Sequence, residues 1–161
     1  MIFIDYLNYL PPQIATMIMA MLPIVELRGS IPVALTVYHL DYLQSYLFSV
    51  VGNIIPVVFL LWLLGPMSGY LMQRYRFANR FFTWLFDRTR HKFVGKYERW
   101  GELALALFVA VPLPVTGAWT GAVAAFIFGI PKQKSLVFIT LGAMLAGVIV
   151  TLTTLGITTI F

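Results

Sequence analysis

The chain has 161 residues, of which 60% are hydrophobic and 11% charged, and its mean hydropathy is +0.88. This composition excludes a soluble domain of this size and predicts one helical membrane domain, because the apolar segments are long and continuous rather than alternating. The absence of cysteine excludes disulfides and thiolate metal sites. The net charge of +5 is distributed in a way that points to a membrane surface rather than to nucleic acid.

The first apolar segment, residues 12–22, is too short to cross a membrane. As a helix it would rise about 17 Å, whereas the hydrocarbon core is about 30 Å thick. It ends at Pro23, and a second short arm runs from Ser30 to Tyr38. Two half-length arms around a polar turn predict a re-entrant hairpin, and the alternative is one kinked span over residues 13–37.

The turn between these arms carries the charges that raise the functional question. Glu26 and Arg28 lie within an apolar run, where a charged side chain is costly and is usually retained for a site, a pathway or a buried partner. Gly29 permits a positive φ, Ser30 is a good helix N-cap, and Pro32 suits the first turn of the next helix. The sequence therefore predicts a second helix that begins at Ser30.

Residues 45–65 form an uncharged segment long enough to span the membrane, and Gly65-Pro66 is expected to end it. Asn53 lies inside this segment, near Pro56. Its amide could line a transport pathway, or it could hydrogen-bond a neighbouring helix beside a proline kink.

Residues 70–100 carry eight of the eleven Lys and Arg residues. Phe77, Phe81 and Leu85 recur at a spacing of four, which predicts an amphipathic helix in the membrane interface with its arginines toward anionic headgroups. A nucleic-acid-binding patch has a similar composition, but the membrane context disfavours it. The positive-inside rule places this connector, residues 67–100, in the cytoplasm.

The second half of the chain repeats the order of the first. It has a short arm, a break with proline and glycine, a second short arm and a long uncharged span, over residues 103–111, 112–117, 118–129 and 135–160. Pro23 and Pro112 are 89 residues apart, and Gly52 and Gly142 are 90 apart. We therefore predict one membrane domain of two repeats, residues 11–66 and 101–161, joined by the connector.

A hairpin that returns to its own side, followed by one span, inverts the next repeat. The predicted fold is an all-α integral membrane protein of two inverted repeats, each a re-entrant helical hairpin followed by one transmembrane helix. This arrangement puts Lys132 and Lys134 on the side of the basic connector, whereas four full spans would put them opposite it. The positive-inside bias favours the inverted arrangement, with both termini outside the cytoplasm.

Three motifs support a family resemblance, namely Glu26–Pro32, Tyr97–Gly101 and Pro112–Gly121. Together they resemble the small multidrug export protein family and, more distantly, the DedA and VTT-domain membrane proteins. The resemblance implies re-entrant hairpins that enter from opposite faces and move an amphipathic solute or a phosphate-bearing lipid. One departure is that Pro112–Gly121 holds no arginine or acid, whereas DedA-type relatives usually carry basic residues there.

The tips of the two hairpins would meet near the middle of the membrane and form a substrate site. Helix N-termini at Ser30 and near Thr116 would offer free N–H groups, and Arg28 would add a charge suited to phosphate or carboxylate. Glu26 could pair with Arg28 until substrate arrives. Alternatively, a permanent pair, or a bond from Glu26 to turn amides, could only neutralise the break. The candidate substrate-binding residues are Glu26, Arg28, Gly29, Ser30, Pro32, Asn53, Pro112, Pro114, Thr116, Gly117 and Thr120.

Three functions fit these features. The first is a multi-pass cell-membrane transporter of an amphipathic or anionic small molecule, with proton coupling through Glu26 as one mechanism. The others are a lipid translocase for polyprenyl phosphate or phospholipid, and a membrane assembly protein without transport. No enzyme, metal or cofactor is expected, because His39 and His91 show no catalytic or metal-ligand spacing. Small residues of the last helix, such as Gly142 and Gly147, are compatible with a homo-oligomer.

Overall fold

The described part of the chain is all helical. A computed structural model describes residues 10–90, 97–112 and 116–160, with side chains described over 10–84, 100–112 and 116–157. The helices are α2 (Pro12–Met21), α3 (Glu26–Thr36), α4 (Tyr42–Arg74), α5 (Arg76–Arg90), α6 (Tyr97–Ala110), α7 (Ala118–Ile127) and α8 (Lys132–Ile160). The chain therefore has the expected all-α class, with short and long helices in the predicted order.

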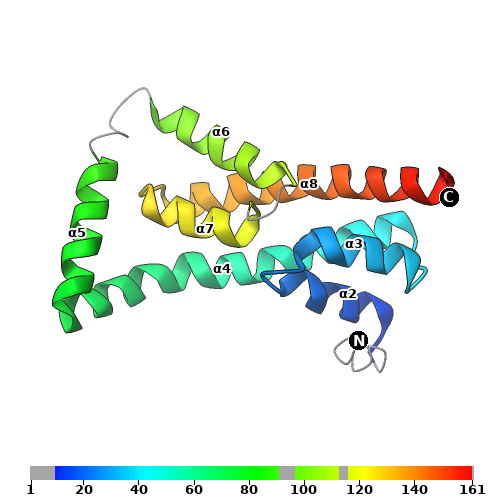
Figure 1. Cartoon of the computed structure of the whole chain (residues 1–161), viewed down its shortest axis with the longest axis horizontal. Coiled ribbons are helices and arrows are strands. Elements are labelled where there is room, and N and C mark those ends of the chain that lie inside the picture. The colour runs from blue at the N-terminus through cyan, green and yellow to red at the C-terminus, as the bar shows by residue number, and fades with distance from the viewer. Residues whose placement is uncertain (1–9, 91–96, 113–115, 161) are drawn as a thin grey trace.

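Each half of the chain contributes two short helices and one long helix (Figure 1). α2 and α3 form one antiparallel pair, and α6 and α7 form the other. The two pairs point toward each other along the long axis of the molecule, so their tips meet near its middle, and α4 and α8 run in opposite directions (Figure 1). α3 packs against both long helices, and α7 does the same, so each pair joins the two halves.

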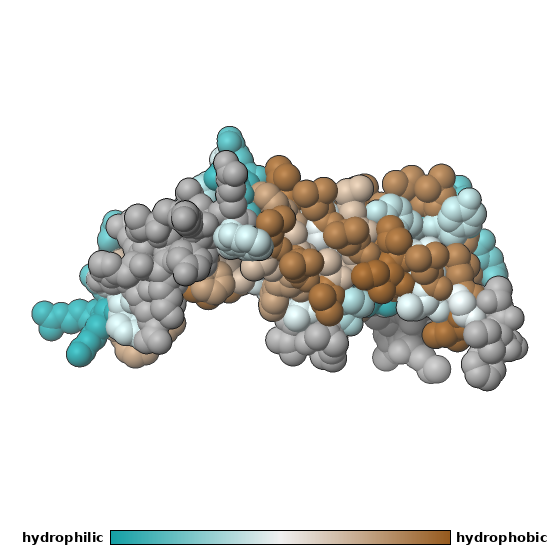
Figure 2. All heavy atoms as spheres, turned by 90° about the horizontal axis from the view of Figure 1, so that it is seen from above, coloured by the Kyte–Doolittle hydropathy of each residue, from teal (hydrophilic) through white to brown (hydrophobic). Residues whose placement is uncertain are grey.

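Two described helices are long and apolar enough to cross a membrane, namely α4 and α8. Their 33 and 29 residues correspond to about 50 and 44 Å. The paired helices have 10 to 14 residues each, or about 15 to 21 Å, which is less than the hydrocarbon thickness of about 30 Å. Figure 2 shows hydrophobic residues over the middle and right of the molecule, as expected of a membrane protein.

The first helix of each pair crosses its long helix at a glycine. A Cβ at Gly52 would overlap the carbonyl group of Met17, and a Cβ at Gly142 would lie 2.5 Å from the carbonyl oxygen of Ala106. Met17 and Ala106 are 89 residues apart, close to the spacing of the two glycines. The two halves therefore make the same backbone contact, at the offset of the sequence repeat.

The helix after the first break begins earlier than predicted. It starts at Glu26 rather than at Ser30, and Pro32 lies in its interior. Ser30 is therefore not an N-cap, and its buried hydroxyl instead donates a hydrogen bond to Ser49 Oγ of α4 at 2.8 Å. Because Ser49 lies 19 residues further along the chain, a rule for local capping cannot detect this use of the hydroxyl.

The first long helix ends later than predicted. The sequence predicts an end at Gly65-Pro66, but α4 continues to Arg74 with Pro56 and Pro66 inside it. Proline is tolerated in apolar membrane helices, because neighbouring helices and local adjustments satisfy the backbone groups that it frees. As a consequence, α4 extends well past the apolar segment and leads almost directly into α5.

Asp41 caps the N-terminus of α4. Its Oδ1 accepts hydrogen bonds from the backbone N–H groups of Leu43 at 2.5 Å and Gln44 at 3.3 Å. We expect Asp41→Ala to lower the free energy of unfolding by about 1 kcal/mol, because the helix loses its acceptor. Thermal unfolding of the purified protein in detergent measures the loss. Asp41→Asn keeps a side-chain acceptor and should retain most of the stability, so an equal loss in both variants would contradict the capping role.

Candidate functional site

The two charged residues of the first tip both reach the second tip. Arg28 Nη2 donates hydrogen bonds to the carbonyl oxygen of Thr116 and, at 3.0 Å, to its Oγ1. Glu26 Oε1 accepts a hydrogen bond from the backbone N–H of Trp119 at 3.4 Å. The Trp119 indole Nε1 donates in the opposite direction, to the carbonyl oxygen of Met21 at 3.2 Å. We call this set of contacts the interhairpin latch.

The Glu26 carboxylate lies against the N-terminus of α7. A Cβ at Gly117, the residue that precedes this helix, would overlap both carboxylate oxygens, so only glycine leaves room for the carboxylate. A helix N-terminus carries unpaired N–H groups and a partial positive charge, which favour an anion. Glu26 is 6% exposed, so the groups that balance its charge are those of α7 and the nearby Arg28 rather than water.

The backbone of Glu26 also departs from regular helix geometry. Its φ is 48°, in the left-handed region that residues other than glycine rarely adopt. Such a conformation costs of order 1 to 3 kcal/mol and persists only where the surrounding structure fixes it. The contacts with α7 give Glu26 such surroundings, and strained residues of this kind cluster at ligand sites and switch regions.

The predicted site residues of the first hairpin have different roles in the structure. Gly29, Ser30 and Pro32 lie within α3. Gly29 does not have a positive φ, and a Cβ there would lie 2.6 Å from Val25 Cγ1, so its small size serves packing. The prediction that free N–H groups at Ser30 bind an anion is therefore wrong, because the helix begins one turn earlier, at Glu26.

The predicted residues of the second hairpin lie close to the latch. Thr116 accepts from Arg28, and Gly117 contacts Glu26. The Thr120 hydroxyl donates to the carbonyl oxygen of Gly117 at 3.2 Å and so supports the first turn of α7. Pro112 follows α6, and Pro114 lies outside the described residues. The N–H groups near Thr116, predicted to bind a substrate anion, face the carboxylate of Glu26 in this state.

Asn53 of α4 is a buried polar residue beside the first hairpin. It is 1% exposed, and its Oδ1 has no hydrogen-bond partner among the described residues. Ser49, one turn before Asn53 in α4, receives a hydrogen bond from Ser30 of α3, so Asn53 lies on the side of α4 that faces α3. A buried acceptor without a donor costs about 1 to 3 kcal/mol. Asn53 Oδ1 is therefore available to a donor that enters this region.

Two latch residues were missed by sequence reasoning. Trp119 and Met21 join the tips through an indole N–H and a backbone carbonyl. A signal was present, because the N–H of a tryptophan in an apolar segment needs a hydrogen-bond partner and Trp119 follows the second break directly. The carbonyl of Met21 gave no signal in the sequence, since every residue carries the same group.

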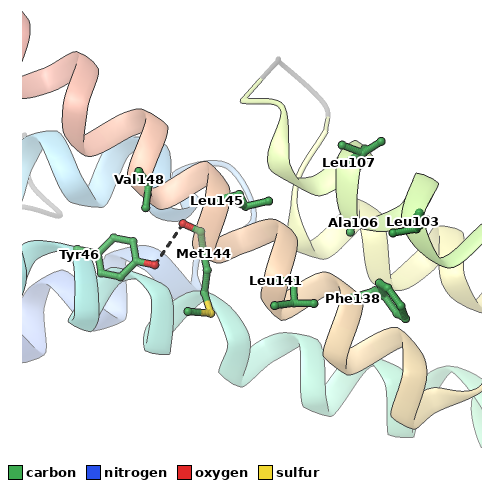
Figure 3. A pocket seen from close by; sticks show the side chains of 9 residues that line it. All are labelled: Tyr46, Leu103, Ala106, Leu107, Phe138, Leu141, Met144, Leu145 and Val148. Carbon is green, nitrogen blue, oxygen red and sulfur yellow. Dashed lines mark hydrogen bonds between the residues drawn. The ribbon is translucent and has the colours of Figure 1, made fainter.

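An apolar groove of about 430 Å³ lies between α6 and α8 (Figure 3). Its described lining residues are Tyr46, Leu103, Ala106, Leu107, Phe138, Leu141, Met144, Leu145 and Val148. Tyr46 of α4 lies at one end, and its hydroxyl donates to the carbonyl oxygen of Met144 at 3.2 Å. None of these residues is charged, so the groove can hold apolar groups but cannot recognise a charged one.

The family comparison covers most of the chain. The family model described as "Putative small multi-drug export protein" matches residues 26–149, which include Glu26, Arg28, Thr116 and Trp119 of the latch but neither α2 nor Met21. No curated protein and no solved structure matches the chain. The more distant relationship to DedA and VTT-domain proteins stays a prediction.

Proposed function

Because the chain belongs to the small multidrug export protein family, we propose that it is a transporter that exports amphipathic small molecules across the cell membrane. The interhairpin latch carries the proposal. It is a set of polar contacts that joins the tips of the two hairpins within a largely apolar helix bundle. Contacts of this kind hold one of two states, and a ligand that competes for them shifts the protein to the other.

In this proposal the two helix pairs are re-entrant hairpins of two inverted repeats. The position of α8 supports it, because Lys132 Nζ, at the start of α8, lies 5.4 Å from the ring centroid of Trp62, in the half of α4 that leads to basic α5. At the same end Lys134 pairs with Glu102 of α6 at 2.8 Å. The positive-inside rule then places this end in the cytoplasm, with the start of α2 and the end of α8 outside.

The substrate is an amphipathic solute with an anionic group, which opens the latch by competition. Its anionic group displaces Thr116 as the hydrogen-bond acceptor of Arg28, because a guanidinium binds carboxylate or phosphate more strongly than a neutral carbonyl. It also competes with Glu26 for the N–H groups at the start of α7. Once displaced, Glu26 is free to take up a proton, and Asn53 Oδ1 offers a nearby acceptor. Proton coupling would follow from that step.

Reconstitution into liposomes tests the activity itself. Purified protein is assayed in parallel for efflux of a fluorescent dye with a carboxylate group and for flipping of a fluorescent lipid phosphate. We expect dye efflux well above that of protein-free liposomes. Lipid flipping without dye efflux would contradict export and support a translocase, and the absence of both activities would support an assembly role.

Cross-linking the hairpin tips tests the latch as the moving part. The described chain is free of cysteine, so Met21→Cys with Trp119→Cys introduces one pair of thiols. A thiol-reactive cross-linker that a reductant cleaves should reduce transport to background, and reduction should restore it. Each single-cysteine variant, treated with the same reagent, is the control. Full transport by the cross-linked protein would show that the tips need not separate.

A further inference from the structure

Helix α5 lies across the end of the helix bundle rather than along it (Figure 1). It follows α4 after the single residue Tyr75 and packs against the second hairpin. The ring of Phe82 contacts the ring of Phe126 in α7, with centroids 6.4 Å apart and planes at 75°. Phe82 therefore holds one side of α5 against the protein, and of the side chains described in this helix, residues 76–84, all but Ala78 and Phe82 are exposed.

The outward surface of α5 has an apolar side. Phe77, Phe81 and Trp84 recur at helical spacing and are 83%, 46% and 54% exposed. One turn of a helix brings residues three or four apart to the same face, so these three rings form one stripe beside the side held by Phe82. A continuous exposed aromatic stripe is typical of a surface that binds a membrane or a protein.

The other outward side of α5 is basic. Arg76, Asn79, Arg80 and Thr83 line a shallow pocket of about 490 Å³ together with Trp84. The two arginines are four residues apart and project from the same face, and residues 76–84 hold no acid. Two guanidinium groups beside an amide and a hydroxyl suit a phosphate group, and none of the described lining residues is an acid.

We propose that α5 docks on the anionic surface of the lipid bilayer. Phe77, Phe81 and Trp84 insert among the acyl chains, and Arg76 and Arg80 bind the phosphate of an anionic phospholipid headgroup. The crosswise position of α5 at the end of the long helices places it in the interface when those helices span the membrane. Through the contact between Phe82 and Phe126, the docked helix holds the last turn of α7 at the membrane surface.

Spin labels test the orientation of α5 in the whole protein. Phe81→Cys and Thr83→Cys, each labelled in the otherwise cysteine-free chain, report the apolar and polar sides in lipid nanodiscs. We expect the label at position 81 to be accessible to oxygen, which concentrates in the acyl region, and the label at position 83 to a water-soluble relaxation agent. Equal exposure of both labels to the water-soluble agent would overturn the proposal.

Lipid selectivity tests the phosphate contact. The measured quantity is the preference of the protein for spin-labelled anionic over zwitterionic phospholipid. In the double variant Arg76→Gln with Arg80→Gln, this preference should fall on the order of fivefold for each arginine removed. The control Arg74→Gln with Lys132→Gln removes two charges at the same end but leaves the pocket intact, and should retain most of the preference. An equal loss in both double variants would show a general charge effect and overturn the site.

Competition with inorganic phosphate distinguishes between two ligands of the α5 pocket, a lipid headgroup and a free anion. Added phosphate should leave the bound lipid in place when compared with chloride at the same ionic strength, because the acyl chains anchor the lipid. Displacement by phosphate alone would identify a site for soluble anions and overturn the membrane proposal.

Discussion

Glu26→Ala is expected to lower the free energy of unfolding by roughly 3 to 5 kcal/mol and to abolish transport. Removing the carboxylate takes away a buried anion that interacts with Arg28, and it leaves the first N–H groups of α7 without the Glu26 acceptor. Thermal unfolding in detergent gives the stability, and dye efflux from liposomes gives the transport rate. Glu102→Ala is the matched control, because its partner Lys134 is half exposed and the pair contributes about 0 to 1 kcal/mol.

A double substitution separates the role of charge from the role of packing. Glu26→Gln with Arg28→Gln keeps groups of similar size that can still form hydrogen bonds, so we expect a folded protein that transports at least about tenfold more slowly. The stranded charge of the alanine variant is absent here, and the stability should be close to that of the wild type. A double variant that transports at the normal rate would show that the latch only packs the tips. Asn53 would then be the next candidate for the substrate site.

Gly52→Leu and Gly142→Leu are each expected to prevent stable folding. A side chain at either position meets a backbone carbonyl of the crossing helix, at Met17 or Ala106, and a backbone atom cannot move aside as the end of a side chain can. Overpacking usually costs about 1 to 3 kcal/mol, and alanine at these positions should already show a loss in this range. Yield of folded protein and its melting temperature measure the effect.

Gly69 of α4 is the control for these variants. A Cβ there would have no described atom of another residue within 4 Å. Gly69→Ala should therefore stabilise the helix by about 0.5 to 1 kcal/mol, because alanine loses less backbone entropy than glycine. If Gly52→Ala were as stable as Gly69→Ala, the close crossing of α2 and α4 would not exist in solution.

The sequence predicted the order of short and long helices because that order depends on local signals. Apolar length distinguished α4 and α8 from the short helices, and prolines and glycines marked both breaks. The starts and ends were less accurate, since α3 begins at Glu26 and α4 ends at Arg74. At those positions tertiary contacts outweighed the local preference of Ser30 for an N-cap and of Pro66 for a helix end.

The candidate site was predicted in part. Glu26, Arg28, Thr116 and Gly117 were selected from the sequence, and the structure brings them together. Their partners were predicted less well. The sequence suggested that Glu26 and Arg28 bind each other or a substrate, whereas in the structure they bind Trp119 and Thr116. The hydrogen bond from the Trp119 N–H to Glu26 spans 93 residues, and no local pattern indicates which distant turn will supply the donor.

The distance along the chain between the latch residues has a consequence for biogenesis. Arg28 is separated from Thr116 by 88 residues, so a ribosome that adds roughly 5 to 20 residues per second needs about 5 to 20 s to supply the partner. During that time the first hairpin holds an acid and a base whose final contacts do not yet exist. The latch of the first half therefore cannot close before the second hairpin is made, and release from the insertion machinery should depend on synthesis of that hairpin.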